Sequence, residues 1–276
     1  MSSQIRFVKM HGAGNDFIMI NAIDGPLDLE EKTIAALCSR HRGIGADGLI
    51  IIRPGESADF RMVYHNSDGG EADMCGNGAR CAARFAYEAG IASTPMRFET
   101  SSGVVEAEID GELVMVGIGE VRGVETGMRL EGVAGDVQFA DSGVPHAIVL
   151  HEEVTTIPDE EFMELAKILR WHSRFEPKGV NVNLVTIRGL HEVVYRTYER
   201  GVEGETEACG TGAAALSVVT AHLGLTAPPV TCITSGGDAI VVDFVQNEGG
   251  ATACSLLGPA ISVFEGSFSL GAFGTG

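Results

Sequence analysis

Two short stretches place a cysteine in nearly the same setting, and both are candidates for acid–base chemistry. Residues 73–79 read Asp-Met-Cys-Gly-Asn-Gly-Ala, and residues 207–213 read Glu-Ala-Cys-Gly-Thr-Gly-Ala. The two cysteines, Cys75 and Cys209, are 134 positions apart (209 minus 75) in a chain of 276 residues. Each half of the chain therefore supplies one thiol. Two matched thiols on opposite sides of one carbon are what the inversion of a stereocentre requires.

Each cysteine turn runs directly into an alanine-rich helical pattern, and this context gives the turn its chemistry. The first N–H groups of a helix have no partner within the helix, and the helix dipole is positive there. Such a turn can bind a carboxylate and lower the pKa of a cysteine beside it. Two facing turns could therefore take a proton from the carbon next to a carboxylate and return one to the opposite face, with one thiolate and one thiol at rest.

Other interpretations of the cysteine turns remain open at this point. A single Cys-Gly-x-Gly is as easily a glycine turn that caps a helix beside a buried cysteine. Two copies, each with an acidic residue two positions before the cysteine and an alanine after the second glycine, favour chemistry. A redox pair that forms a disulfide between the halves would fit the same spacing, but it would not need anion sites built from glycine. A non-catalytic binding protein is the remaining alternative.

Composition narrows the class of protein and its partners. The formal charge of -19 argues against nucleic acid as a partner, and no apolar run approaches the 18 residues of a membrane span. Residues 1–20 lack the pattern of a signal peptide, so we expect a cytoplasmic protein with reduced thiols. The cysteine spacing matches no zinc signature, so we expect no metal. We predict ordinary buried thiols at Cys38, Cys81, Cys232 and Cys254.

Apolar patterning repeats one plan in the two halves. We predict an α/β fold of the α+β kind with mixed, mostly antiparallel sheets, in which two pseudo-symmetric lobes arose by internal duplication. Each lobe is expected to be a curved sheet around a central helix, with the active site in the cleft between the lobes. The predicted lobes are residues 1–121, which carry Cys75 and are rejoined by 261–276, and residues 122–260, which carry Cys209. The last residues, 271–276, are expected to fray.

The predicted elements follow from apolar periodicity and turn residues. Asp28 is a plausible N-cap for the first helix, and Gly90 a stop for the second. We predict further helices at 77–88, 158–171 and 211–223. We predict strands at 5–10, 17–20, 49–52, 60–65, 95–100, 103–110, 112–118, 136–140, 145–151, 181–187, 191–198, 229–234, 239–245 and 251–257.

One glycine motif is misleading. Residues 43–48 match the dinucleotide fingerprint GxGxxG. That fingerprint needs a strand before it and a helix after it, whereas here a helix precedes and a strand follows. We therefore reject nucleotide binding at this motif.

The ordered set of motifs resembles the diaminopimelate epimerase family over essentially the whole chain. The matching segments are residues 9–17 (KMHGAGNDF), 42–48 (RGIGADG), 66–69 (NSDG), 74–81 (MCGNGARC), 143–146 (GVPH), 181–183 (NVN), 199–202 (ERGV) and 208–212 (ACGTG).

The resemblance implies an isomerase that interconverts LL-2,6-diaminopimelate and meso-2,6-diaminopimelate without pyridoxal phosphate or metal, in lysine and peptidoglycan-precursor biosynthesis. It also implies a homodimer and the catalytic pair Cys75 and Cys209. Only four lysines occur, and none is in a recognisable Schiff-base setting, which agrees with a reaction that needs no cofactor. By family analogy, the substrate-binding residues are Asn15, Asn66, Gly76, Asn77, Asn181, Glu199, Arg200, Gly210 and Thr211.

Residue chemistry agrees with these implied roles. Arg200 suits a bidentate grip on the distal carboxylate, and Glu199 could accept from the substrate ammonium. Backbone N–H groups of the two turns would bind the reacting carboxylate. His146 either acts through the catalytic groups or is structural.

Three departures from the family pattern concern recognition of the distal end of the substrate. Val144 replaces an expected asparagine, Gly48 stands where some members have glutamine, and the segment from Arg200 to Cys209 is one residue longer than usual. The longer segment carries Glu203, Glu205 and Glu207. Val144 leaves open a racemase of another amino acid, whereas Arg200 favours a substrate with a second carboxylate.

Overall fold

The computed structural model describes residues 4–72 and 74–272, which divide into two compact units. Unit 1 holds the described residues up to Val116 and from Pro259 onward, and unit 2 is Gly117–Gly258. The predicted lobe limits were 121 and 261. Asp73, the acidic residue of the first cysteine motif, and residues 273–276 of the expected tail lie outside the described residues.

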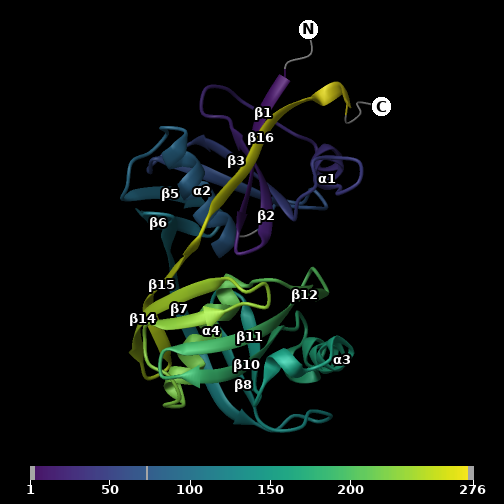
Figure 1. Ribbon diagram of the computed structural model, residues 1–276, viewed down its shortest axis with the longest axis vertical. Helices are drawn as coiled ribbons and strands as arrows, with labels where there is room; N and C mark the ends of the chain where they lie inside the picture. Colours follow the sequence, from purple (N-terminus) through teal and green to yellow (C-terminus); the bar gives the residue numbers. More distant parts are fainter. Residues whose placement is uncertain (1–3, 73, 273–276) are drawn as a thin grey trace. The chain divides into compact units, whose positions relative to one another are not determined.

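Unit 1 is a mixed sheet in which the first and last strands of the chain are neighbours (Figure 1). The order is β16-β1-β2-β3-β4-β5-β6-β7, and every pair is antiparallel except β2–β3 and β4–β5. The strands are β1 (Gln4–Gly12), β2 (Asn15–Asn21), β3 (Gly48–Pro54), β4 (Phe60–Asn66), β5 (Met96–Thr100), β6 (Gly103–Asp110), the start of β7 (Leu113–Met128) and β16 (Ile261–Ser269).

Unit 2 repeats this plan. Its order is β7-β8-β9-β10-β11-β13-β14-β15, again antiparallel except for the third and fifth pairs, β9–β10 and β11–β13. An additional β15–β7 pairing closes the series. The strands are β8 (Val137–Asp141), β9 (Pro145–Leu150), β10 (Asn181–Gly189), β11 (Glu192–Glu199), β12 (Gly204–Thr206, paired with β11), β13 (Val230–Ile233), β14 (Ala239–Asn247) and β15 (Gly250–Pro259).

Each parallel pair is connected by a helix, as parallel neighbours require. In unit 1, α1 (Glu31–Cys38) joins β2 to β3, and α2 (Gly76–Glu88) joins β4 to β5. In unit 2, α3 (Asp159–Arg170) and α4 (Gly210–His222) make the equivalent connections. The second helix of each unit is buried along almost its whole length among the strands (Figure 1). The predicted α+β class, with two lobes that repeat one plan, is confirmed.

The first helix of each unit packs on the other face of the sheet. Ile34 and Leu37 of α1 meet Ile18 and Ile51 of the strands, and Phe162, Ala166 and Leu169 of α3 do the same in unit 2. Because both faces of β3 are covered, its sequence is a continuous apolar run rather than an alternating one.

Strand register gives the equivalence between the two units. Gly48 pairs with Phe17 and Asn66, and Asn181 pairs with His146 and would oppose Glu199 in the β10–β11 register. Gly48 therefore corresponds to Asn181, Phe17 to His146, and Asn66 to Glu199. Counting two residues back from Phe17 and His146 places Val144 where unit 1 has Asn15. Counting two residues forward along β3 and β10 places Asn183 where unit 1 has Ile50.

Several details differ from the prediction. The N-cap of α1 is Glu30, not Asp28, because the helix begins only at Glu31. β7 runs to Met128, ten residues beyond the predicted end at 118, and passes through several glycines. We did not predict β12 or β16. Across residues 4–72 and 74–272, no helix has the length and apolar character of a membrane span.

Candidate active site

Cys75 and Cys209 occupy the same backbone position, the N-cap of the buried helix of each unit. Both have extended backbone angles, with φ and ψ of -112° and 126° for Cys75 and -126° and 109° for Cys209. The first intrahelical bonds run from Ala79 N to Cys75 O (2.7 Å) and from Ala213 N to Cys209 O (2.9 Å). The N–H groups that come before these bonds, from Gly76 in α2 and from Gly210 in α4, have no acceptor within the helix. An anion site at a helix N-terminus is built from such N–H groups.

The thiol of Cys75 faces an amide oxygen. Its Sγ lies 3.6 Å from Oδ1 of Asn15, which also accepts from Nδ2 of Asn77 at 3.3 Å. Asn77 is buried and accepts from Nη2 of the fully buried Arg80 at 2.8 Å. Three predicted site residues, Asn15, Cys75 and Asn77, are thus in direct contact within unit 1.

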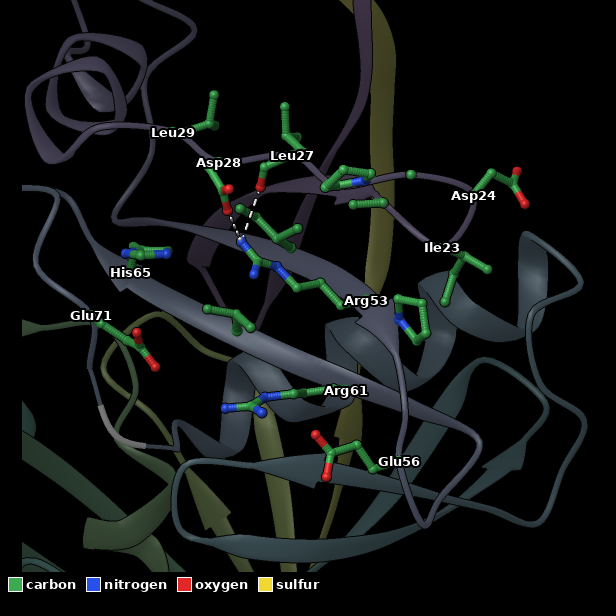
Figure 2. Close-up of a pocket in the computed structure, with 16 residues that line it drawn as sticks. Ile23, Asp24, Leu27, Asp28, Leu29, Arg53, Glu56, Arg61, His65 and Glu71 are labelled. Carbon is green, nitrogen blue, oxygen red and sulfur yellow. Dashed lines mark hydrogen bonds and ion pairs between the residues drawn. The ribbon is translucent and has the colours of Figure 1, made fainter.

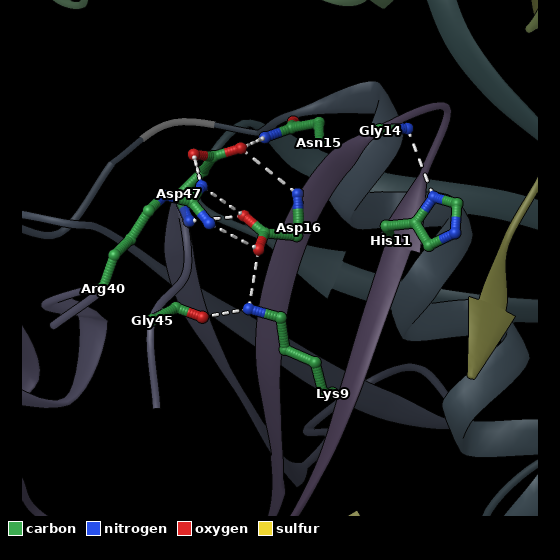
Figure 3. A network of polar contacts seen from close by, with 8 residues as sticks. All are labelled: Lys9, His11, Gly14, Asn15, Asp16, Arg40, Gly45 and Asp47. Carbon is green, nitrogen blue, oxygen red and sulfur yellow. Dashed lines mark hydrogen bonds and ion pairs between the residues drawn. The ribbon is translucent and has the colours of Figure 1, made fainter. Parts of the chain in front are cut away.

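A charged network fixes the orientation of the Asn15 amide (Figure 3). Nδ2 of Asn15 donates to Oδ2 of Asp47 at 2.8 Å, so its Oδ1 is turned toward Cys75. Asp47 in turn accepts from Arg40, which is shared with Asp16. Sequence reasoning missed Asp47, although it lies in one of the family motifs.

Asp16 is the centre of that network. It forms ion pairs with Arg40 at 3.0 Å and with the buried Lys9 at 2.6 Å, and Lys9 also donates to the carbonyl of Gly45. Burial alone would raise the pKa of Asp16, but hydrogen bonds from Arg40 and Lys9 bring that pKa down to about 2. Asp16 therefore stays ionised at neutral and mildly acidic pH.

Asn66 lies at the exposed end of β4, and a tyrosine orients it. Its Oδ1 accepts from the Tyr64 hydroxyl at 2.9 Å. The Tyr64 ring occupies the space beside Gly48, where an added Cβ would lie 2.6 Å from both that ring and the His65 carbonyl. Glycine at position 48, noted above as a departure, therefore makes room for a tyrosine that holds a predicted substrate-binding residue.

The thiol of Cys209 has different neighbours and is almost completely buried. Its Sγ lies 3.4 Å from Oε2 of Glu199 and 3.4 Å from the Thr211 hydroxyl. Burial and the negative charge of Glu199 raise the pKa of Cys209 well above its ordinary value, while hydrogen bonds from Thr211 and the Gly212 N–H act in the opposite direction. The hydroxyl of Thr206 donates to the other oxygen of Glu199 at 2.5 Å.

His146 lies fully buried beside this cysteine turn. Its Nε2 is 3.1 Å from the Thr211 hydroxyl, and its Nδ1 is 3.0 Å from Nδ2 of Asn183. Burial, with a smaller contribution from Arg200, lowers the pKa of His146 to about 3, so the ring is neutral. His146 thus touches a predicted site residue, and Asn183, which we had not singled out, touches His146. A polar residue between Val182 and Leu184 of a buried strand was the available signal.

Asn181 and Arg200 are joined through the backbone. Oδ1 of the buried Asn181 accepts from the Arg200 N–H at 2.8 Å. Among the described residues, no carboxylate lies within ion-pair distance of the Arg200 guanidinium, whereas the nearby Arg170 and Arg196 are both paired. Arg200 is thus the arginine of this region that can receive a carboxylate from a ligand.

The lengthened segment after Arg200 is held by the two other arginines. Arg170 donates to Glu203 from Nε at 3.1 Å and from Nη2 at 2.7 Å, and Arg196 grips Glu205 at 2.8 and 2.6 Å. Glu203 and Glu205 therefore fix the loop through ion pairs with buried arginines. Sequence reasoning could not assign this, because Arg170 lies 33 positions before its partner.

The remaining cysteines match their predicted role. Cys38, Cys81, Cys232 and Cys254 are free and buried. Burial raises the pKa of the first three to about 12 and that of Cys254 to about 11. These thiols are therefore protonated at neutral pH, and the described residues contain no cluster of three or more His, Cys, Asp or Glu side chains with metal-binding geometry.

An open pocket of about 640 Å³ lies elsewhere in unit 1, beside the loop from Ala22 to Leu29 (Figure 2). None of the predicted site residues lines it. Its arginine Arg53 donates to the carbonyl of Leu27 at 2.9 Å and to Asp28 at 3.2 Å. Arg53 thus ties the loop to β3, and both acidic and basic side chains line the pocket.

Comparison with solved structures defines the class of fold. The chain superposes on a hydroxyproline epimerase from Agrobacterium vitis with a TM-score of 0.72 at 17% identity, covering 99% of this chain and 93% of that one. It superposes on a phenazine biosynthesis protein of the PhzF family from Bacillus anthracis with a TM-score of 0.71 at 15% identity, covering 96% and 99%. At these identities the likeness concerns the fold, which is one that includes amino-acid epimerases.

Sequence comparison defines the family. The family model for diaminopimelate epimerase matches residues 7–124 and 138–261. The diaminopimelate epimerase of Aquifex aeolicus is 39% identical over 279 residues, covering 96% of this chain and 98% of the relative. That of Archaeoglobus fulgidus is 37% identical, covering 97% of both. The chain belongs to the diaminopimelate epimerase family.

Proposed function

We propose that this chain interconverts LL-2,6-diaminopimelate and meso-2,6-diaminopimelate with a pair of thiols and without pyridoxal phosphate or metal. The observation that carries the proposal is the matched placement of Cys75 and Cys209 at the N-caps of two equivalent buried helices. One sulfur removes the α-proton as a thiolate, and the other, as a thiol, delivers a proton to the opposite face. The roles exchange with reaction direction, so the two thiols titrate as a pair.

The first turns of α2 and α4 would stabilise the charge that develops on the reacting carboxylate. N–H groups of Gly76 and Asn77, and of Gly210 and Thr211, are the proposed donors. Donors already oriented toward the place where charge appears need no reorganisation during the reaction, which makes this contribution large.

Recognition of the distal end is assigned to the polar residues at the ends of the equivalent strands. Arg200 would bind the second carboxylate bidentately, and Glu199 would accept from an ammonium. Asn181 already accepts from the Arg200 backbone through Oδ1, so its Nδ2 is the end directed to substrate. Asn15 and Asn66 would present acceptor or donor atoms in orientations set by Asp47 and Tyr64.

The central experiment follows deuterium from solvent into the α-carbon of each diaminopimelate isomer, without added pyridoxal phosphate. Incorporation together with epimerisation is expected. Single Cys75→Ala and Cys209→Ala variants should abolish epimerisation, and activity that survived both single changes would refute the thiol mechanism. A ligand-bound crystal structure supplies the geometric check, because the two sulfurs must be separated by the width of one tetrahedral carbon.

A second candidate is a racemase of another amino acid. Val144, at the position equivalent to Asn15, and the fold shared with the hydroxyproline epimerase of Agrobacterium vitis favour it. Rates across a panel of amino acids decide between the two, since a requirement for a distal carboxylate selects diaminopimelate. An Arg200→Met variant should lose most of its activity on diaminopimelate and little of any activity on a monocarboxylic amino acid.

We also propose that the protein is a cytoplasmic homodimer. Strand β16 has β1 as its neighbour on one side, and its exposed side chains include Ile261, Val263 and Phe264, which are 46%, 56% and 50% exposed. An apolar edge strand of nine residues is a surface that proteins usually cover. Sedimentation should show a dimer, and Val263→Lys with Phe264→Glu should convert it to a folded monomer.

A further inference from the structure

A chain of buried hydrogen bonds connects the core of unit 2 to the sulfur of Cys209. It runs from Nδ2 of Asn183 to Nδ1 of His146 (3.0 Å), from Nε2 of His146 to the Thr211 hydroxyl (3.1 Å), and from that hydroxyl to Sγ (3.4 Å). Asn183 and His146 have no exposed surface. Because water does not reach these groups, their donor and acceptor roles are set by the protein alone.

A main-chain carbonyl fixes the direction of this chain. Nδ2 of Asn183 also lies 3.3 Å from the Ala147 carbonyl, which can only accept. The opposite orientation of the amide would bring two oxygens together, so Nδ2 faces both Ala147 and His146. Nδ1 of His146 must then be the acceptor, and the proton of the neutral ring lies on Nε2.

The histidine tautomer in turn fixes the hydroxyl. Nε2–H of His146 donates to Oγ1 of Thr211, which leaves the hydroxyl hydrogen of Thr211 for the sulfur of Cys209. A hydrogen bond donated to sulfur favours the thiolate, the form that can act as a base.

The other groups around Cys209 do not replace this donor. The carboxylate of Glu199 can only accept when ionised, so it favours the protonated thiol. The Tyr195 hydroxyl bonds the backbone of Cys209, at 3.1 Å from O and 3.3 Å from N, and not the sulfur. The Arg200 charge acts on the His146 ring. The Gly212 N–H also bonds the sulfur, as a backbone donor, and the side-chain donor that opposes Glu199 there is Thr211.

We propose that Asn183 is a positioning residue for the acid–base chemistry of Cys209, because it holds His146 in the tautomer that makes Thr211 a donor to the sulfur. The inference rests on the proposed function in taking Cys209 as one of the two acid–base groups. Unit 1 contains no counterpart, since Phe17 and Ile50 occupy the positions of His146 and Asn183. The chain of hydrogen bonds from Asn183 to Cys209 therefore makes one thiol different from the other.

The first test reads the tautomer directly and needs no variant. Nitrogen-15 NMR of the histidine-labelled full chain should show His146 protonated at Nε2 alone, with no titration above pH 4. In an Asn183→Leu variant, which keeps the volume and removes the donor, both tautomers should appear. A wild-type ring protonated at Nδ1 would overturn the proposal even if no variant folded.

The second test reads the thiol. Alkylation of Cys209 by iodoacetamide is followed against pH by peptide mass spectrometry in a Cys75→Ser background. Asn183→Leu should slow alkylation at neutral pH about 10-fold and move the profile to higher pH, the effect of losing one hydrogen bond to the thiolate. The buried amide Gln138, which accepts from the Gly127 N–H at 2.6 Å, supplies the matched control as Gln138→Met.

A double variant with Thr211 shows whether Asn183 acts through the Thr211 hydroxyl or through the stability of the fold. In a Thr211→Val background, Asn183→Leu should slow alkylation no further, because the donor on which it acts is already absent. An equal slowing in that background, or an equal effect of Gln138→Met, would refute the proposal. Neither readout requires turnover of diaminopimelate, so a failure of the proposed substrate would be seen separately in the exchange assay.

Discussion

The two cysteine turns have the same backbone but are supported by different residues. A Cβ added to Gly78 of unit 1 would contact apolar side-chain atoms of Ile50, Met62 and Phe17 at 3.0 to 3.5 Å. A Cβ added to Gly212 of unit 2 would lie 2.5 Å from Oδ1 of Asn183, its nearest atom. The repeated sequence thus preserves the helix N-terminus, while the strands beneath it decide how each thiol is solvated and hydrogen-bonded. Catalytic asymmetry can arise in this way without any change in the motif itself.

The loops beyond the two equivalent strand ends differ as well. After β4, the turn at Asn66 is closed by short-range bonds, from Asn66 N to Gly70 O and from Gly69 N to Asn66 O, both 3.0 Å. After β11, the segment that begins at Arg200 is held by two buried arginines, Arg170 from α3 and Arg196 from β11 itself. The first loop is fixed by its own backbone hydrogen bonds, and the second by ion pairs, of which Arg170–Glu203 spans 33 positions.

The largest effect is expected when unit 2 receives the residue that unit 1 has at the position of His146. His146→Phe copies Phe17, removes the donor to Thr211 and leaves the Ala147 carbonyl as the acceptor for Nδ2 of Asn183. We expect kcat to fall about 100-fold, the usual effect of removing one oriented hydrogen-bond donor from a catalytic group. Steady-state kinetics with either diaminopimelate isomer measures this. Wild-type kcat in His146→Phe would mean that the polar support has no catalytic role.

An alanine in place of the second glycine of each turn compares the side chains that pack against the two turns. Gly212→Ala forces a methyl group against a buried amide oxygen and should destabilise unit 2 by about 3 kcal/mol. Gly78→Ala meets flexible ends of apolar side chains at 3.0 Å or more and should cost about 1 kcal/mol. Urea unfolding of both variants gives the difference, and equal costs would mean that the two turns rest on equally yielding neighbours.

Acid should weaken the two units in different pH ranges. The pKa of His146 falls from 6.5 to about 3 on folding and that of Asp16 from 3.8 to about 2, so both groups contribute stability at high pH that acid removes. The His146 contribution should decline from pH 6.5 downward at up to about 1.4 kcal/mol per pH unit, whereas that of Asp16 should decline only between pH 4 and 2.

Urea unfolding across pH tests both windows. His146→Phe should flatten the slope between pH 6.5 and 4, and Asp16→Asn should leave that part unchanged. The reverse assignment would show that the charged network of unit 1, and not the buried histidine of unit 2, controls stability at mildly acidic pH.

The long-range hold on the Arg200 segment should appear in substrate binding. Glu203→Gln removes the charge that pairs with the buried Arg170 and loosens the loop that presents Arg200. We expect KM for diaminopimelate to rise about 5-fold with kcat within 2-fold, since about 1 kcal/mol of positioning is lost. Glu160→Gln on the exposed face of α3 is the control. A fall in kcat at constant KM would place Glu203 in the chemical step.

The smallest expected effect concerns Val144. Val144→Asn restores the asparagine that unit 1 has at Asn15, on a half-exposed turn. One added exposed hydrogen bond should lower KM for diaminopimelate by about 2- to 3-fold. An unchanged KM would mean that position 144 does not face the substrate.

Most elements were predictable because their residues alternate or repeat against a buried face. The four helices and most strands fall within a few residues of their predicted limits. β16 was not predicted because its first five side chains are exposed, so its sequence has no buried periodicity. β12 was not predicted because it is only three residues long. The start of β7 was predicted, but its continuation to Met128 was not, because glycines usually mark loops.

The site was predictable to the extent that its residues share one local motif. The repeated turn predicted Cys75 and Cys209 as a pair, because glycines before a helix indicate an anion site beside a thiol. Asp47 and Asn183 were not predicted, because their effect depends on partners 32 and 37 positions away in the chain. Only the folded register shows that Asn183 lies beside His146 and Asp47 beside Asn15.

The division of the chain into units also bears on its synthesis. Unit 2 is one continuous segment, Gly117–Gly258, whereas unit 1 needs the last strand, β16, to pair with the first, β1. A ribosome therefore releases all of unit 2 before it has made the partner of β1. Until β16 emerges, the nascent chain carries an unpaired strand edge of the kind that chaperones recognise and that promotes aggregation.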